Sequence, residues 1–396
     1  MSRGGGNLVD AHTTHTSEPR QTPPRVVDLR RTRTPDIEIV ACPTYDLLLS
    51  LQVALASPDY DYADYDVGRE WAAAARRRCD EADPNALATL ERYLGHRPPY
   101  ALHATLISLV AECPPPREPT QFLAWLAEIP IVQFVQVLLD HEAQGTTWPD
   151  LLAAVLAETA AGREAPVAIL TSLLDCFAGE VRPTVAEVVR APEAARRELL
   201  GALHVWNDAV FAAERPEITP FLEREAALLE RQRAEMPAER FIKVAMRGVE
   251  WRGQVSFRRI VLAPSYFCRP AVYYHEWRGT LTFCIPVETA VLEAETRAAD
   301  PKAPSEEILQ FFLTLGDKTR LRILRLLAER EMYLTELAER LGLTKATTKH
   351  HMVMLRANGF VILYERDRMT YYALRSDIAR HAAHLIGEYL GQAEQS

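Results

Sequence analysis

The sequence has no uninterrupted apolar run long enough to cross a lipid bilayer, and its first ten residues lack the hydrophobic core of an export signal. Its six cysteines are scattered along the chain, and no CxxC pair occurs. Disulfide frameworks and zinc knuckles need closely paired cysteines, so this scatter is typical of buried thiols in a reducing compartment. We therefore expect a cytoplasmic protein.

Sequence signatures of the common enzyme classes are also missing. There is no G-x-S-x-G, no P-loop, no H-E-x-x-H and no dinucleotide-binding fingerprint. The densest aromatic cluster could line a ligand pocket, but a sheet core or a dimer contact is the favoured interpretation. This cluster comprises Tyr266, Phe267, Cys268, Tyr273, Tyr274 and Trp277. The sequence therefore predicts no enzyme activity and no cofactor.

An excess of positive charge is absent as well. Acidic residues outnumber basic ones by 54 to 45, which gives a net charge of −9. A chain with this balance should not bind polyanions without specificity, so any DNA contact must come from locally clustered positive charge. Its 396 residues, 48% of them hydrophobic, are enough for two or three domains.

The first three quarters of the chain predict a disordered tail and one large domain. Residues 1–35 are rich in Gly, Thr, Pro and Arg and are expected to be disordered. Residues 36–287 predict an α+β domain with a body of proline-separated helices and a small, mostly antiparallel sheet. Strands are expected at residues 36–41, 241–249 and 255–263, and in a hairpin of residues 271–275 and 280–285. Residues 288–304 are expected to form a linker.

Residues 334–360, LTELAERLGLTKATTKHHMVMLRANGF, predict a helix, a tight turn and a second helix. Thr335 and Thr344 can cap the two helices with their hydroxyl groups. Gly342 lies between them and suits the left-handed conformation that ends a helix. Apolar side chains recur at helical spacing in both segments, so one face of each helix is expected to be buried.

The second helix carries cationic and hydroxyl side chains away from its expected buried face. Such side chains near the start of the second of two angled helices suit insertion into a DNA major groove. The residues predicted to contact DNA from this helix are Thr344, Lys345, Thr347, Lys349 and His350. The two lysines suit phosphate anchoring as well as base reading.

A predicted β-hairpin follows the second helix. Residues 360–364 and 370–374 are rich in β-forming side chains. Arg366 and Arg368 lie at or near the expected tip, where they could contact the DNA backbone or a minor groove.

Residues 305–391 resemble the winged-helix domain of ArsR-type bacterial transcriptional regulators. The segments LGDKTRLRILRLL, LTELAERLGLTKATTKHHMVMLRANGFV and YERDRMTYYAL carry this resemblance, which covers about the last quarter of the chain. In general layout the chain is similar to regulators that have a long N-terminal domain of uncertain function. The resemblance implies a C-terminal winged helix-turn-helix and a homodimer built by its flanking helices, expected here at residues 305–315 and 377–390.

The metal sites of metal-sensing ArsR-type proteins are not matched. Some members place cysteines on the first helix of the helix-turn-helix, but residues 333–339 contain none. Others use the last helix, where His381, His384 and Glu388 share a face. The Asp-x-His element of those members would need histidine at Ala379. Dimer packing or surface exposure is therefore favoured for these three residues, and no metal site is predicted.

These patterns together favour a cytoplasmic transcriptional regulator that represses an operator as a homodimer. Its partner would be double-stranded DNA, and its N-terminal domain would sense an unknown signal such as a small-molecule effector. The alternative is an enzyme or a protein-interaction module whose winged helix makes protein contacts.

Overall fold

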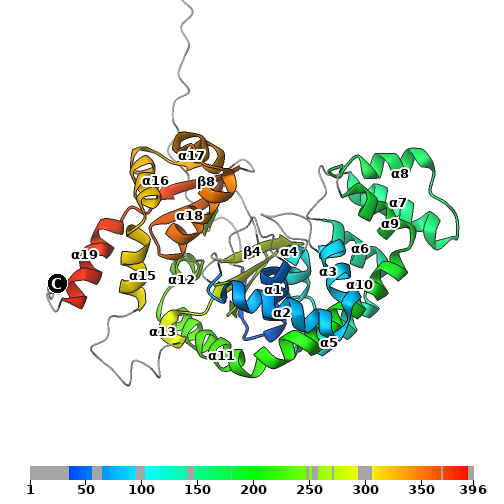
Figure 1. Ribbon diagram of the computed structural model, residues 1–396, viewed down its shortest axis with the longest axis horizontal. Coiled ribbons are helices and arrows are strands. Elements are labelled where there is room, and N and C mark those ends of the chain that lie inside the picture. The colour runs from blue at the N-terminus through cyan, green and yellow to red at the C-terminus, as the bar shows by residue number, and fades with distance from the viewer. Residues whose placement is uncertain are drawn as a thin grey trace, which may run out of the picture.

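The computed structural model describes residues 35–55, 65–94, 103–140, 147–179, 181–246, 249–251, 257–269, 272–292, 306–366 and 369–390. Apart from Pro35, the predicted disordered tail lies outside these ranges, as do residues 293–304 of the predicted linker. We call the described part of residues 35–292 the N-terminal domain and residues 306–390 the winged helix (Figure 1).

A helical body makes up most of the N-terminal domain. Several of its helices begin at a proline, whose fixed φ suits a first helical turn and whose missing N–H costs nothing there. The helices are α1 (Pro43–Leu55), α2 (Gly68–Ala82), α3 (Pro84–Leu94), α4 (His103–Leu109), α5 (Pro119–Glu128), α6 (Ile131–Leu139), α7 (Trp148–Ala160), α8 (Val167–Leu174), α9 (Arg182–Arg190), α10 (Pro192–Trp206), the π-helical η3 (Asn207–Phe211) and α11 (Ala212–Glu235).

The N-terminal domain also contains a four-stranded sheet, in the order β1-β3-β5-β4. Its strands are β1 (Asp36–Ile39), β3 (Arg259–Ser265), β4 (Tyr273–Trp277) and β5 (Thr280–Pro286). The predicted hairpin is confirmed as β4 and β5, and the left-handed φ of 48° at Arg278 and 79° at Gly279 makes its tight turn.

The sheet is mixed, where the sequence predicted a mostly antiparallel one. β1, β3 and β5 run parallel, and only β4 is antiparallel. The helical body connects β1 to β3, and such a long crossover allows parallel pairing. The α+β class itself is confirmed.

Each face of this sheet belongs to a different core. Val261, Ala263 and Cys284 pack with the helical body. Ile260 and Phe283 point to the other face, into a core that includes buried residues of the winged helix. The two domains therefore share a continuous apolar core on that side of the sheet.

Helix α12 (Ala238–Ala245) occupies most of the segment in which a strand over residues 241–249 was predicted, so that prediction is wrong. Phe241, Ile242 and Ala245 are buried. They stand at positions i, i+1 and i+4, which lie on one face of a helix. Only β2 (Val249–Trp251) is extended, and it leaves the N-terminal domain to join the sheet of the winged helix.

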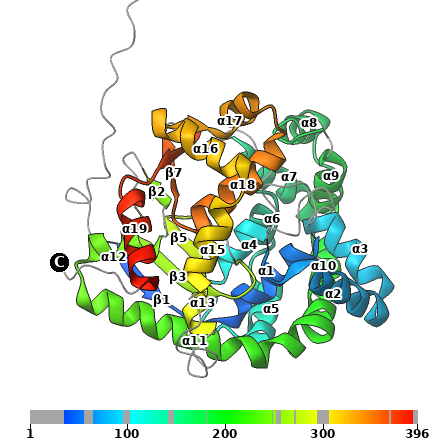
Figure 2. The same cartoon turned by 60° about the vertical axis from the view of Figure 1, so that its left-hand side comes forward.

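The winged helix contains α15 (Glu306–Leu315), α16 (Lys318–Glu329), β6 (Met332–Tyr333), α17 (Leu334–Leu341), α18 (Lys345–Ala357), β7 (Val361–Arg366), β8 (Met369–Leu374) and α19 (Ile378–Tyr389). Helix α13 (Thr289–Leu292) precedes it, and its sheet has the strand order β2-β7-β8-β6. Helix α11 runs from the helical body towards α13, below the sheet in the view of Figure 1. Figures 1 and 2 both place α18 on the side of the winged helix that faces the N-terminal domain.

Within the described residues, no single helix is long and apolar enough to cross a membrane. Helices α5 and α6 together pass the test of length and composition, but they are bent by 114°. Phe122 and Phe134, one on each helix, are buried in the core of the helical body.

Candidate nucleic-acid interface

The turn between α17 and α18 forms as its sequence predicts. Gly342 has a φ of 71°, and the Leu343 N–H donates to the carbonyl of Ala338 at 3.0 Å, which closes the end of α17. Helix α17 begins at Leu334, and its N-cap residue, Tyr333, makes no side-chain cap. The predicted capping role of Thr335 is therefore wrong, because Thr335 already lies inside the helix.

Helix α18 is capped by Thr344 and buried along one stripe, as predicted. The Thr344 hydroxyl accepts a hydrogen bond from the Thr347 N–H at 3.0 Å and lies 2.8 Å from the Thr347 hydroxyl. Thr348, Met352 and Leu355 are buried against the scaffold of the winged helix. This anchoring fixes which side of α18 is left for other contacts.

The five predicted DNA-contacting residues of α18 divide into two groups. Thr344, Lys345 and Thr347 are exposed at the first turn, so a cation and two hydroxyl groups stand together at the helix start. Lys349 and His350, one turn further on, are half-buried. The first turn is therefore the part of the predicted surface that is directly open to solvent.

Lys349 lies in an environment that disfavours its charge. Burial, together with repulsion from the Arg356 guanidinium, lowers the pKa of Lys349 to about 8. Arg356 is itself only 9% exposed and donates to the carbonyl of Val272 in the N-terminal domain at 3.4 Å. This contact between domains could not be predicted from the sequence, because helical periodicity reports only which side faces the local core.

The paired histidines have different surroundings. His350 and His351 lie edge to face at a centroid distance of 5.4 Å. His351 Nδ1 is 3.7 Å from an oxygen of Asp317, the residue that caps α16 by accepting from the Arg320 N–H. Burial lowers the pKa of His351, although the Asp317 charge opposes that effect. His351 therefore favours its neutral form near pH 7 and lies close to the cap of α16.

The wing is formed by β7 and β8, which pair antiparallel from Val361 and Leu374 to Arg366 and Met369. Tyr364 and Tyr371 stack at 5.6 Å across the two strands. The side chain of Arg366 and the whole of Arg368 lie outside the described residues. Their predicted contacts with the DNA backbone stay predictions.

Helices α15 and α19 present apolar side chains to solvent. Phe311 is buried and stacks on Phe360 at 4.9 Å. Phe312 and Leu313 of α15 are 49% and 63% exposed, and Tyr389 at the end of α19 is 53% exposed. These flanking helices therefore pack with one face and leave a second apolar face uncovered.

No group of three or more His, Cys, Asp or Glu side chains that could hold a metal ion occurs among the described residues. The ring of His381 packs edge-on against Phe311, with 6.4 Å between centroids. His384 is exposed, and the side chain of Glu388 lies outside the described part.

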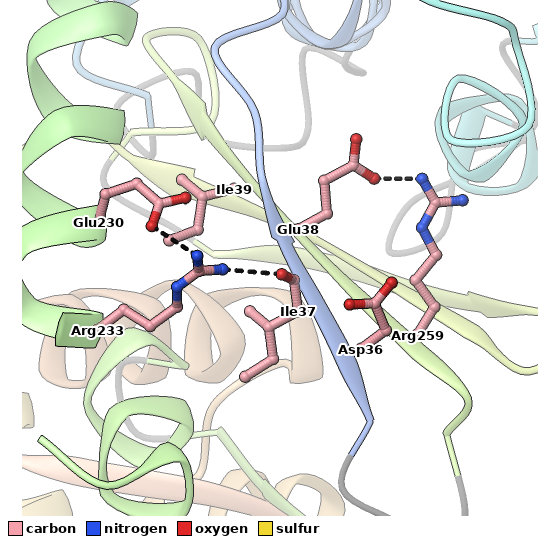
Figure 3. A pocket seen from close by; sticks show the side chains of 7 residues that line it. All are labelled: Asp36, Ile37, Glu38, Ile39, Glu230, Arg233 and Arg259. Carbon is pink, nitrogen blue, oxygen red and sulfur yellow. Dashed lines mark hydrogen bonds and ion pairs between the residues drawn. The ribbon is translucent and has the colours of Figure 1, made fainter.

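A pocket of about 540 Å³ lies beside the free edge of β1 (Figure 3). It is open and mostly charged, and Arg233 at its rim donates to the Ile37 carbonyl at 2.9 Å. The lining residues are Asp36, Ile37, Glu38, Ile39, Glu230, Arg233 and Arg259. The aromatic cluster predicted around Tyr266 lies elsewhere, where Phe267 and Cys268 are buried in the core of the helical body.

Comparisons with known proteins match the C-terminal part of the chain. The family model "Bacterial regulatory protein, arsR family" matches residues 317–362. The HTH-type transcriptional regulators CmtR of Mycobacterium tuberculosis and Mycobacterium bovis are each 38% identical over 74 residues, which are 19% of this chain and 60% of the relative. The "Transcriptional repressor SmtB homolog" of Synechocystis is 23% identical over 104 residues, 25% of this chain and 79% of that protein.

The chain thus spans less than two thirds of the length of the mycobacterial relatives. No solved structure matches it.

Proposed function

Because residues 317–362 form a helix-turn-helix domain of the arsR family, we propose that this protein is a DNA-binding transcriptional regulator. One observation carries the proposal: the first turn of α18 is capped and open to solvent, with Lys345 beside two hydroxyl groups. A cationic helix start that is open to solvent suits major-groove recognition. We assign no enzymatic role to the protein, and a regulator of bacterial genes would work in the cytoplasm.

We further propose that it binds as a homodimer. One short helix reads only a few base pairs, so specificity requires two half-sites roughly 34–36 Å apart. The exposed apolar face of α15, with Phe312 and Leu313, and the end of α19, with Tyr389, suit a two-fold contact between copies. Repression is the favoured direction of regulation, since one relative is described as a repressor.

Replacing Lys345 by glutamate tests the DNA-binding surface. Lys345→Glu should weaken binding to the DNA upstream of the protein's own gene by at least about tenfold, because it inverts a charge next to phosphate. Arg197→Glu makes the same charge change on an exposed position of α10 in the helical body and serves as the control. Equal gel-shift affinities for the two variants would refute the assignment of α18.

Replacing Leu313 by glutamate tests the dimer. Leu313→Glu places a charge in the exposed apolar face and should shift the protein to monomers in analytical ultracentrifugation. Val167→Glu changes an exposed apolar residue of α8 that is remote from α15 and should leave the mass unchanged. A Leu313→Glu variant that stays dimeric would contradict this interface.

The alternative use of the winged helix, in protein contacts, is supported by one observation, the hydrogen bond from Arg356 to Val272. This contact lies on the side of α18 and leaves the first turn open to solvent, so it does not by itself favour protein contacts over DNA recognition. We propose that the N-terminal domain acts through this contact as the regulatory part of the molecule, with a small-molecule effector as the candidate signal.

A further inference from the structure

One side of helix α18 faces the N-terminal domain. Lys349, Val353 and Arg356 follow at spacings of four and three residues, so they line one side of the helix, which we call the inner flank. Arg356 is buried and bonded to the Val272 carbonyl, and the other two residues are half-buried. The inner flank therefore meets the N-terminal domain at Arg356, in the last turn of the helix.

A covered flank is incompatible with full insertion of α18 into DNA. An α-helix with its side chains is about 10–12 Å across, and the major groove is about 12 Å wide. A helix in the groove therefore needs both of its flanks free. With Arg356 held on the N-terminal domain, α18 cannot enter the groove along its whole length, and its exposed first turn is the part that can approach a duplex.

Strand β2 is a second link between the two domains. It pairs in parallel with β7 in the register Val249–Leu363, Glu250–Tyr364 and Trp251–Glu365, so it covers the outer edge of the wing sheet. It is not a strand of the N-terminal sheet, whose order is β1-β3-β5-β4. Strand β2 therefore helps to dock the winged helix, although β2 does not belong to the N-terminal sheet.

The chain length around β2 limits how far the winged helix can move. Strand β2 begins at Val249, three residues after Met246 at the end of α12. Three residues span at most roughly 11 Å when fully extended. As long as β2 stays paired with β7, the wing is held within that distance of α12.

We propose that the structure is a closed state, in which the shared apolar core, the β2–β7 pairing and the inner-flank contact hold the winged helix against the N-terminal domain. DNA binding by α18 then requires β2 to leave β7, so that the inner flank becomes free. The inference rests on the proposed function and adds its regulation: a signal that stabilises the closed state would release DNA. The low pKa of Lys349 agrees with this state, since DNA phosphates would stabilise the charge that the closed state disfavours.

A reversible cross-link in the full-length protein tests the closed state. Trp251 and Glu365 are in register on adjacent strands, so the double variant Trp251→Cys, Glu365→Cys is the pair chosen for oxidation to link β2 with β7. The oxidised double variant should bind the DNA upstream of its own gene about tenfold more weakly than the same protein after reduction. Each single cysteine variant is the control and should bind equally with and without reductant.

A second variant opens the closed state. Glu250→Pro removes a backbone N–H and fixes φ in the middle of the three-residue strand β2, so pairing with β7 should be lost. Because β2 is not in the N-terminal sheet, the fold of that domain should be retained. This variant should bind the same DNA about three- to tenfold more tightly than the wild type.

The possible results separate the two proposals. Equal affinity of the oxidised and reduced forms, or weaker binding by a folded Glu250→Pro variant, would overturn the closed state and leave the proposed function intact. If neither the wild type nor the reduced variant binds any DNA fragment, the proposed function fails, and the closed state fails with it.

Discussion

Replacing Lys349 by methionine should make the protein more stable while weakening its binding to DNA. The structure holds the ammonium group in a half-buried position beside the Arg356 guanidinium. Methionine has a similar length, carries no charge and fills irregular apolar space easily. The substitution therefore removes the electrostatic cost of the closed state together with a predicted phosphate contact.

The size of the effect follows from the pKa. A lysine whose pKa falls from 10.5 to about 8 on folding loses about 3 kcal/mol of folding free energy at neutral pH. Part of the side chain reaches solvent, so we expect a gain of about 2 kcal/mol for Lys349→Met at pH 7. Lys345→Met, at an exposed position of the same helix, should change stability by no more than about 0.5 kcal/mol.

The gain should depend on pH in a defined direction. Between about pH 8 and pH 10.5 the unfolded wild type binds more protons at Lys349 than the folded wild type does. The free energy of unfolding of the wild type therefore rises across this window relative to that of Lys349→Met, and the difference disappears near pH 10.5. Urea unfolding followed by tryptophan fluorescence from pH 7 to pH 10.5 measures this difference. A gain that stays constant over that range, or a loss of stability at pH 7, would refute the reasoning.

Three further substitutions test local features. Thr344→Ala removes the cap on the Thr347 N–H and should cost about 1 kcal/mol in urea unfolding, whereas Thr344→Ser should keep the stability. Gly342→Ala should cost about 1 kcal/mol through its φ of 71° alone, since no atom lies within 4 Å of the added Cβ, and Gly342→Asn should cost less. Burial raises the pKa of Asp46 to about 6, although its carboxylate accepts bonds from the Ser265 hydroxyl and the Phe267 N–H, so ionisation lowers the stability of the wild type as pH rises from about 4 to 6. Asp46→Asn does not ionise and should therefore gain about 2 kcal/mol relative to the wild type over this window, whatever the difference at pH 4; a pH-independent difference in thermal unfolding would contradict this.

Local signals in the sequence were enough to predict the winged helix. The cap at Thr344, the left-handed Gly342 and the buried stripe of α18 each depend on residues within one or two turns of each other. The hairpin of β4 and β5 was predicted for the same reason, because its turn residues lie between its two strands. Such signals do not require knowledge of the rest of the chain.

Long-range packing could not be predicted in the same way. The parallel pairing of β1 with β3 and of β2 with β7 joins segments that are far apart in sequence. Helix α12 was mistaken for a strand because a short segment with a few buried residues fits both periods. The sequence of α18 alone placed Lys349 on the open surface, because helical periodicity does not report how deeply a side chain beside the buried stripe is covered.

The site residues remain predictions of unequal support. Lys345 and Thr347 are exposed beside the cap, which supports a role in DNA contact. Lys349 needs the closed state to open before it can reach a duplex. Arg366 and Arg368 were placed by the hairpin pattern alone, and their side chains lie outside the described residues.

Hydroxyl-radical footprinting of the full-length protein on the DNA upstream of its gene tests the central claim most directly. If two copies each present α18 to a major groove, two protected segments should appear with centres about 10–10.5 base pairs apart, or a multiple of that distance. Lys345→Glu should remove both segments at the same protein concentration. An absence of protection by the folded wild-type protein, or the same two segments with Lys345→Glu, would contradict recognition through the exposed first turn of α18.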